Sequence, residues 1–95
     1  MSYVYFILDS LSNAIKIGYA DSIDSRLISL QVGNPRDLEL LHYIECKNSE
    51  HSRLVEDSYH KQFEHLHIRG EWFKYDESMF RDLFLREGSS RYEQL

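Results

Sequence analysis

Apolar and polar positions alternate in three stretches of the chain, which predicts a small sheet. Residues 3–8 (YVYFIL) are aromatic and β-branched, and residues 14–18 (AIKIG) alternate apolar and polar side chains. The turn-forming residues 9–13 (DSLSN) between them predict a β-hairpin. A third strand is expected over residues 36–46 (RDLELLHYIEC). One face of that strand should carry Leu38, Leu40, His42, Ile44 and Cys46.

Helical spacing appears twice after the hairpin. A first helix is expected to begin after Asp21 or Ser22, either of which can cap it, and to end at Gly33. A longer helix is expected from about Glu50 to Leu66. The apolar faces of the two helices, at i, i+4 and i+7 spacing, should consist of Ile23, Leu27 and Leu30 in the first and of Val55, Tyr59, Phe63 and Leu66 in the second.

The last third of the chain is less regular. Residues 67–70 (HIRG) break the helical pattern, and residues 71–75 (EWFKY) read as a short extended aromatic segment. Its large aromatic side chains, Trp72 and Phe73, are expected to close the core. Asp76 can cap a last helix. The apolar residues of that helix are Met79, Phe80, Leu83 and Phe84.

Together these elements predict an α+β domain with the order ββαβα followed by a C-terminal helix. The sheet is expected to be three-stranded and mainly antiparallel, made of the hairpin and the later strand, with helices flanking it. A chain of 95 residues is long enough for one domain with one modest core. We therefore expect a single domain over residues 1–87 and a flexible C-terminal tail over residues 88–95.

Charge and cysteine content narrow the classes of function. The net charge of −5 counts against tight, non-specific DNA binding, because that binding depends on a basic surface. The single cysteine, Cys46, excludes an intrachain disulfide and suits a cytoplasmic protein. No apolar run approaches the length of a membrane span, so no membrane partner is expected. A zinc site is disfavoured because His60, His65 and His67 do not share a helix face.

Two charged residues lie at the rims of the apolar helix faces. At about 100° per residue, Arg26 lies roughly 60° from Ile23 and about 40° from Leu30, and Glu56 lies about 65° from the centre of its stripe. Both side chains are therefore expected to lean over the sheet. In the simplest case they pair with each other or run along the core edge. In the alternative, they serve phosphoryl chemistry, in which a cation stabilises the phosphate and a carboxylate holds a divalent ion.

In their order and spacing these residues resemble the GIY-YIG nuclease superfamily, in particular a short branch of phage and bacterial proteins with K-I-G … R-L and E-x-x-x-H … G-E-W-F signatures. Tyr3-Val4-Tyr5 stands where that family has G-I-Y, and Lys16-Ile17-Gly18 stands where it has Y-I-G. Arg26 follows that glycine by eight residues, and Glu56 lies in the helix that supplies the family's metal ligand. Gly70-Glu71-Trp72-Phe73 matches the closing signature of the branch.

The resemblance implies a metal-dependent endonuclease that hydrolyses DNA phosphodiester bonds with one divalent ion, Mg²⁺ or Mn²⁺. In that scheme Tyr5 orients or deprotonates the attacking water, and Arg26 stabilises the phosphate. Glu56 is the metal ligand, and Lys16 contacts the phosphate or acts as a base. Gly18 lets the backbone come close to the site.

The chain also departs from the pattern of that family. Lys16 stands where the family has a tyrosine, and Leu30 stands where many relatives have a histidine or tyrosine. His60, four residues after Glu56, is therefore an auxiliary candidate, and Glu71 is a second one.

Several of these residues have structural alternatives. Tyr5 fits a core aromatic residue, Lys16 fits a solvated strand residue, and His60 fits a histidine on the helix surface or a semi-buried one. The alternative function is a non-catalytic binding module with the same fold, which binds a protein partner or a DNA end without cutting. The acidic net charge and Leu30 favour that alternative. A homodimer is a further expectation, because two subunits would cut two strands and enlarge a small core.

Overall fold

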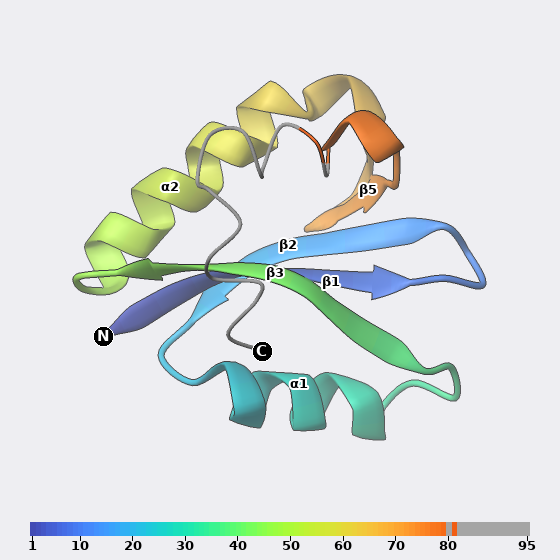
Figure 1. Ribbon diagram of the computed structural model, residues 1–95, viewed down its shortest axis with the longest axis horizontal. Helices are drawn as coiled ribbons and strands as arrows, with labels where there is room; N and C mark the ends of the chain where they lie inside the picture. The colour runs from blue at the N-terminus through green and yellow to red at the C-terminus, as the bar shows by residue number, and fades with distance from the viewer. Residues whose placement is uncertain (80, 82–95) are drawn as a thin grey trace.

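The predicted α+β class and the order of hairpin, helix, strand and helix are confirmed by the structure (Figure 1). The computed structural model describes residues 1–79 and 81. In chain order, the elements are β1 (Ser2–Asp9), β2 (Ala14–Ala20), α1 (Ile23–Val32), β3 (Leu38–Cys46), α2 (Ser49–Gln62), the 3₁₀-helix η1 (Glu64–Leu66), β4 (His67–Arg69) and β5 (Trp72–Lys74).

The sheet is larger than predicted. Its strand order is β3-β1-β2-β5-β4, and all neighbouring strands are antiparallel, so the expectation of three strands was wrong. The hairpin β4–β5 turns at Gly70, whose φ is 55°, and pairs with the edge of β2. A strand of three residues is too short for alternation to reveal it in the sequence. The pairing itself follows from the need of the β2 edge for hydrogen-bond partners.

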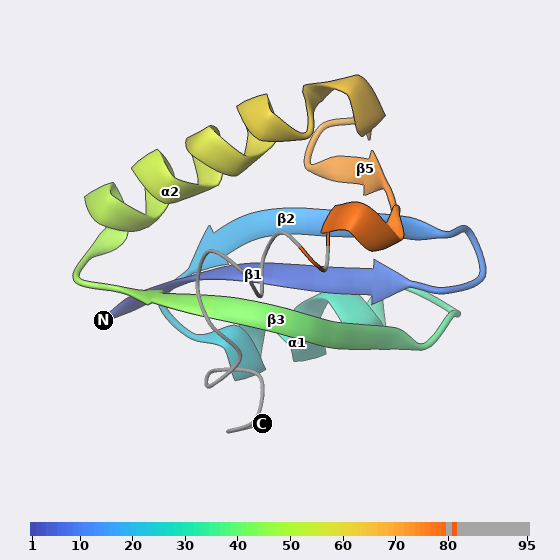
Figure 2. The same ribbon diagram turned by 45° about the horizontal axis from the view of Figure 1, so that its top comes forward.

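The helices α1 and α2 lie on opposite faces of the sheet (Figures 1 and 2). Helix α2 packs on β1, β2 and β3, and the core lies between it and the sheet. Val55 and Leu66 pack against this core, so the predicted apolar stripe of α2 is confirmed. The buried core residues are Val4, Phe6, Ile15, Ile17, Leu41, Ile44, Cys46, Tyr59, Phe63, Phe73 and Met79.

Strand β1 is buried on both of its faces. Val4 and Phe6 belong to the core under α2, whereas Tyr5 and Ile7 alternate with them and lie on the α1 side. All four side chains are at most 1% exposed. This double burial explains why residues 3–8 form a continuous apolar run.

A register shift in β3 changes which of its residues face the core. The pairing of β3 with β1 skips one residue between His42 and Leu40. The skipped residue, Leu41, is buried in the core. Leu38 and Leu40 are therefore not on the face of His42, and the prediction of one shared face was wrong for them. A bulge adds one residue and inverts the alternation on one side of it, which a strict period of two does not anticipate.

The helices differ from their predicted extent and burial. The apolar face of α1 is only half-buried, and none of its residues is fully buried. Ile28 and Val32 of α1 are largely exposed. Helix α2 ends at Gln62 rather than Leu66, because η1 replaces its last turn. Within the described residues, no helix combines the length and the apolar character that crossing a membrane requires.

The beginning of the predicted C-terminal helix is visible in the structure. Residues 77–79 and 81 are helical, Met79 is buried in the core, and Asp76 accepts a hydrogen bond of 2.9 Å from the Ser78 backbone N–H. The other predicted residues of this helix lie outside the described residues, as does the predicted tail. These are Phe80, Leu83, Phe84 and residues 88–95.

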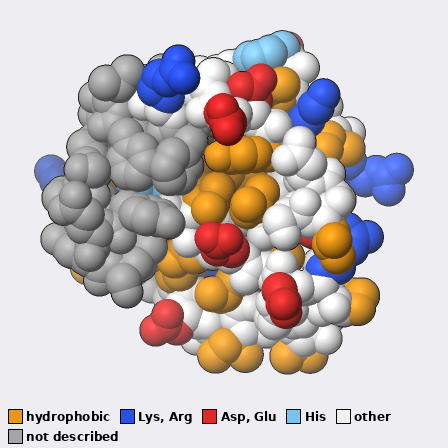
Figure 3. Space-filling view, turned by 45° about the vertical axis from the view of Figure 1, so that its right-hand side comes forward, with side chains coloured by type: hydrophobic (Ala, Val, Ile, Leu, Met, Phe, Trp, Pro, Cys, Tyr) orange, Lys and Arg blue, Asp and Glu red, His pale blue; other side chains and the backbone are white. Residues whose placement is uncertain are grey.

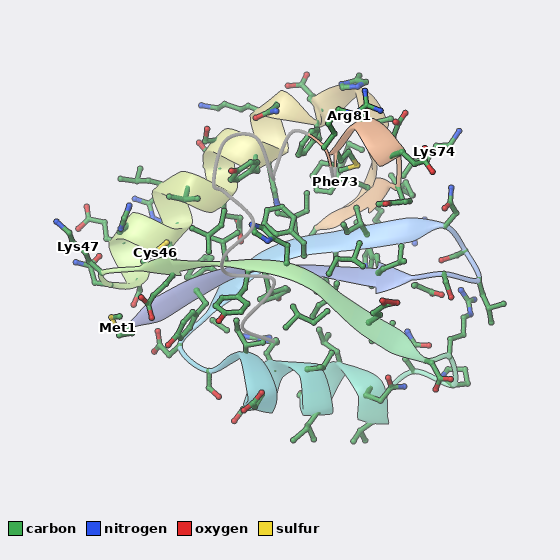
Figure 4. The ribbon with its side chains drawn as sticks, in the orientation of Figure 1. Met1, Cys46, Lys47, Phe73, Lys74 and Arg81 are labelled. Carbon is green, nitrogen blue, oxygen red and sulfur yellow. The ribbon has the colours of Figure 1, made fainter. Side chains whose placement is uncertain are left out.

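The two aromatic residues of β5 have different environments. Phe73 is 1% exposed and points into the layer between β5 and α2, whereas Lys74 points outward (Figure 4). Trp72 is only half-buried and is not part of the core. The prediction that both aromatic residues close the core is therefore confirmed for Phe73 and wrong for Trp72, because adjacent strand residues face opposite sides.

Because Phe73 is buried and Trp72 is only half-buried, their alanine variants should lose unequal amounts of stability. Phe73→Ala should lower the free energy of unfolding by about 3 kcal/mol, since it leaves a cavity in a closed core. Trp72→Ala should cost less than about half as much, although it removes the larger side chain. Urea denaturation of both variants measures this, and equal losses would contradict the assignment of Trp72 to the surface.

Candidate active site

Gly18 lets two polar side chains occupy the same small space. It stands opposite Tyr5 in the pairing of β1 with β2. A Cβ atom at this position would overlap the Tyr5 hydroxyl and lie 2.6 Å from Glu71 Oε1. Only a hydrogen atom fits there, so the glycine is required by space. The Tyr5 hydroxyl and the Glu71 carboxylate therefore lie together over Gly18.

The backbone of Ile17 forms hydrogen bonds with two candidate residues, Glu71 and His60, beside Gly18. Its N–H donates a hydrogen bond of 2.9 Å to the carbonyl oxygen of Glu71. Its carbonyl oxygen accepts a hydrogen bond of 2.8 Å from His60 Nε2. Because a carbonyl can only accept, this Nε2 carries the proton and is not free to act as a base. His60 therefore fastens α2 to the edge of β2.

Lys16 lies between an acid and an aromatic ring. Its Nζ is 3.3 Å from Glu71 Oε1 and 5.4 Å from the centroid of the Trp72 ring, and its side chain is only 16% exposed. A cation held by a carboxylate and a ring face has a defined position. The alternative of a freely solvated lysine is therefore wrong.

Glu56 of α2 has a largely buried carboxylate, one oxygen of which has no partner among the described residues. Its side chain is 13% exposed, and Oε1 is 4.0 Å from His60 Nε2. Its other oxygen, Oε2, is buried without a hydrogen-bond partner among the described residues. Burial raises the pKa of Glu56, and the charge of Glu71 adds to this, while His60 and Lys16 act in the opposite direction. A buried carboxylate in this state is unfavourable unless a cation binds it.

The Tyr5 hydroxyl lies within the electrostatic reach of three charged candidates. Burial raises the pKa of Tyr5 to about 12, and the charges of Glu71 and Glu56 contribute to this, while that of Arg26 opposes it. Tyr5 therefore keeps its proton at neutral pH. Among the two roles predicted for Tyr5, this favours orienting a water molecule over deprotonating it.

Arg26 lies on the exposed surface of α1. It lines an open hollow of about 380 Å³ together with three serines, Ser22, Ser25 and Ser29. Among the described residues it forms no ion pair with Glu56, so the simple alternative of mutual pairing is wrong. Its guanidinium is exposed and therefore available to an anion, and its charge acts on Tyr5.

The structure thus brings most of the predicted residues to one edge of β2. Tyr5, Lys16, Glu56 and Glu71 interact directly or through their charges, and Arg26 approaches from α1. Within residues 1–79 and 81, no three His, Cys, Asp or Glu side chains gather to bind a metal ion by themselves. A metal ion at Glu56 would therefore complete its coordination with water and substrate oxygens, as Mg²⁺ usually does.

Comparison with protein families identifies the domain. The model of the T5orf172 domain matches residues 2–86, which is most of the chain. The chain belongs to the T5orf172 domain family. No curated protein and no solved structure matches this T5orf172 domain.

The family assignment suggested by the sequence motifs was therefore wrong. The matching family is the T5orf172 domain, and no GIY-YIG model matches. The motifs that carried the resemblance are three or four residues long and already differ from that family at Tyr3, Lys16 and Leu30. The roles of the site residues consequently depend on their geometry in this T5orf172 domain.

A larger residue at position 18 tests whether Tyr5 and Glu71 already fill the space over Gly18. Gly18→Ala should displace Tyr5 and Glu71 and lower the free energy of unfolding by about 1–3 kcal/mol. Gly33→Ala is the matched control, because no atom lies within 4 Å of its Cβ position and its φ is −87°. Thermal unfolding of both variants measures the difference. A Gly18→Ala protein as stable as the Gly33→Ala control would show that the space is not filled.

Because one oxygen of Glu56 has no partner among the described residues, we expect Glu56→Gln to change the stability of the protein in a way that depends on pH. Without metal, Glu56→Gln should raise the stability at pH 7 by about 1 kcal/mol, because it removes a buried charge. Since the pKa of Glu56 is raised in the folded state, its ionised form costs stability at neutral pH. That cost disappears as the pH falls through the raised pKa, so the two proteins should converge near the ordinary glutamate pKa of 4.5.

Melting temperatures of the metal-free proteins between pH 4 and pH 7 measure this convergence. Glu45→Gln, at an exposed position of β3, is the control and should follow the wild type at every pH. A Glu56→Gln protein that is less stable than the wild type at pH 7 would show that the carboxylate has a partner that stabilises it.

Proposed function

We propose that the protein is a metal-dependent endonuclease that hydrolyses DNA phosphodiester bonds. The observation that supports this best is the buried Oε2 of Glu56, which has no hydrogen-bond partner among residues 1–79 and 81 and lies beside Tyr5 and Glu71. A fold rarely retains an uncompensated buried carboxylate oxygen without a use for it. The single cysteine suits a cytoplasmic protein.

The donor set at this position fits a hard divalent ion. Glu56 would hold Mg²⁺ or Mn²⁺ through its oxygens, and it would be the single protein ligand among the described residues. When bound, such an ion supplies positive charge to the phosphate and to the leaving oxygen. His60 lies beside this carboxylate, with its Nε2 4.0 Å from Glu56 Oε1, and is itself hydrogen-bonded to β2.

Two cations of the chain would bind the phosphate. Arg26 presents its guanidinium from α1, where it faces an open hollow and has no ion-pair partner among the described residues. Lys16 is held at the neighbouring position by Glu71 and Trp72. A planar guanidinium and an ammonium group on two sides would stabilise the charge that develops on the phosphate oxygens.

Glu71 would accept the proton of the attacking water, which Tyr5 would orient. Because the pKa of Tyr5 is about 12, its hydroxyl stays protonated and donates a hydrogen bond. We assign the proton acceptor to Glu71, whose Oε1 shares the space over Gly18 with that hydroxyl. As the water oxygen bonds to phosphorus and the P–O bond breaks, a water proton passes to Glu71, while the Tyr5 hydroxyl keeps its own proton and only orients the reacting groups. Solvent then reprotonates the leaving alkoxide and removes the proton from Glu71.

The surface charge suggests how the substrate is held. The net charge is −5, and the described side chains in Figure 3 show acidic, basic and apolar groups interspersed on one face. Binding would therefore depend on the few cations around the site, and it would weaken less with added salt than binding through many phosphate contacts.

A non-catalytic binding module is the second candidate function. It is favoured by the net negative charge of the chain and by the ion pair between Lys16 and Glu71. Such a module would bind DNA or a protein with no requirement for the Glu56 carboxylate.

Cleavage of supercoiled, branched and single-stranded DNA in Mg²⁺ or Mn²⁺ tests the proposed activity. Glu56→Gln and Arg26→Ala should each reduce the rate by more than about 100-fold, because each removes charge stabilisation at the phosphate. Glu71→Gln should also reduce the rate, and it should change the dependence of the rate on pH. Glu45→Gln is the control and should retain wild-type activity.

Two outcomes would contradict the nuclease. One is a wild-type protein that cleaves none of these substrates with either metal ion. The other is a Glu56→Gln protein that cleaves as fast as the wild type. Binding without cleavage would support the second candidate function.

A further inference from the structure

Trp72 is a large aromatic residue that the core does not use. It is the single tryptophan of the chain, and it is half-buried outside the core cluster. It stands opposite Lys16 in the pairing with β2 and opposite Arg69 in the pairing with β4. Core packing therefore does not explain why a tryptophan lies between two basic residues.

A hollow of about 350 Å³ lies beside this tryptophan. Ile68, which contributes to its wall, is 58% exposed. A volume of this size lies at the lower end of the range for small-ligand sites. The hollow combines an aromatic wall with exposed apolar surface and a basic rim. The residues that line it are Asp9, Ser12, Ala14, Ile68, Arg69 and Trp72.

Asp9, an acidic residue in the lining of the hollow, repels a negatively charged ligand only weakly. Asp9 Oδ2 accepts a hydrogen bond of 2.8 Å from Arg36, and Oδ1 accepts hydrogen bonds from the backbone N–H groups of Leu11 and Ser12. Burial alone would raise the pKa of Asp9, but the hydrogen bonds from Ser12 and the charge of Arg36 lower it. Both carboxylate oxygens are thus engaged within the protein.

The hollow is continuous with the candidate active site. Ala14, Lys16 and Gly18 occupy alternate positions of β2, so they form one row on one face of the sheet. At about 3.3 Å per residue, this row is roughly 13 Å long. The Tyr5–Glu71 pair lies at the Gly18 end of the row and the hollow lies at the Ala14 end. Lys16 lies between them, with Trp72 opposite it on β5.

We propose that this hollow binds an unpaired nucleobase of a single-stranded DNA segment, with the base stacked on Trp72. Lys16 and Arg69 would neutralise the backbone of that segment between the hollow and the active site. Stacking on an aromatic ring accepts any base, so the site would select single-stranded structure and not sequence. The inference rests on the proposed nuclease for the position of the reacting phosphate, and it restricts the substrate to DNA that is single-stranded or branched beside the cut.

The single tryptophan allows a direct test with the full chain. Titrating the protein with a single-stranded oligothymidylate in EDTA should quench the Trp72 fluorescence in a saturable way, because a stacked base contacts the only indole in the protein. A duplex of the same length should leave the fluorescence unchanged. The absence of metal prevents cleavage during the titration.

Variants then test the contribution of the ring to affinity. By the anisotropy of a labelled oligothymidylate, Trp72→Ala should weaken binding about 5- to 150-fold, whereas Trp72→Phe should retain most of the affinity. Leu54→Ala, at an exposed apolar position of α2, is the control and should bind like the wild type. Circular dichroism of Trp72→Ala verifies that the fold is retained.

The outcomes separate this inference from the proposed nuclease. Unchanged fluorescence at saturating oligonucleotide, or equal affinity of the Trp72→Ala variant, would overturn the nucleobase site even if the protein cleaves DNA. Absence of any single-strand binding would also overturn it. Quenching in a protein that cleaves nothing would support the nucleobase site and contradict the nuclease.

Discussion

The hydrogen bonds of one edge residue, Ile17, determine the arrangement of the candidate site. Strand β2 pairs with β5 over only three residues, so its backbone beyond Lys16 needs other partners. The N–H of Ile17 donates to Glu71, and its carbonyl oxygen accepts from His60. These two bonds bring the residue before β5 and the last turn of α2 to the same point. Tyr5, Glu56 and Glu71 are assembled there as a consequence of completing the sheet.

The space at that point is controlled by Gly18. Any side chain there would collide with the Tyr5 hydroxyl or with Glu71, so the close approach of these two groups requires glycine. The crowding brings three acidic or weakly acidic groups close together, and the pKa values of Tyr5 and Glu56 are both raised as a result of burial and of their neighbours. Such mutual destabilisation is typical of sites that bind a cation or move a proton.

The sequence predicted the position of a side chain best where its residue type occurs in few structural environments. A charged residue at the rim of an apolar helix face correctly indicated a largely buried position for Glu56, whereas Arg26 at the rim of the α1 face is exposed. The same reasoning assigned Trp72 to the core, because large aromatic residues in small proteins usually belong there. Its true position depends on the pairing of β5 with β2, which orients Phe73 inward and Trp72 outward. Short motifs also suggested the wrong family, since patterns of three residues recur in unrelated proteins.

By itself the sequence determined the α+β class, the first hairpin, both helices and the positions of the charged residues along them. These features arise from local spacing, which is encoded within a few turns or strand residues. Only the tertiary structure decided the two added strands, the bulge in β3 and the convergence of Glu71 and His60 on Ile17. These features depend on backbone hydrogen bonds between segments far apart in the chain, and no local pattern of side chains records which distant backbone groups will pair.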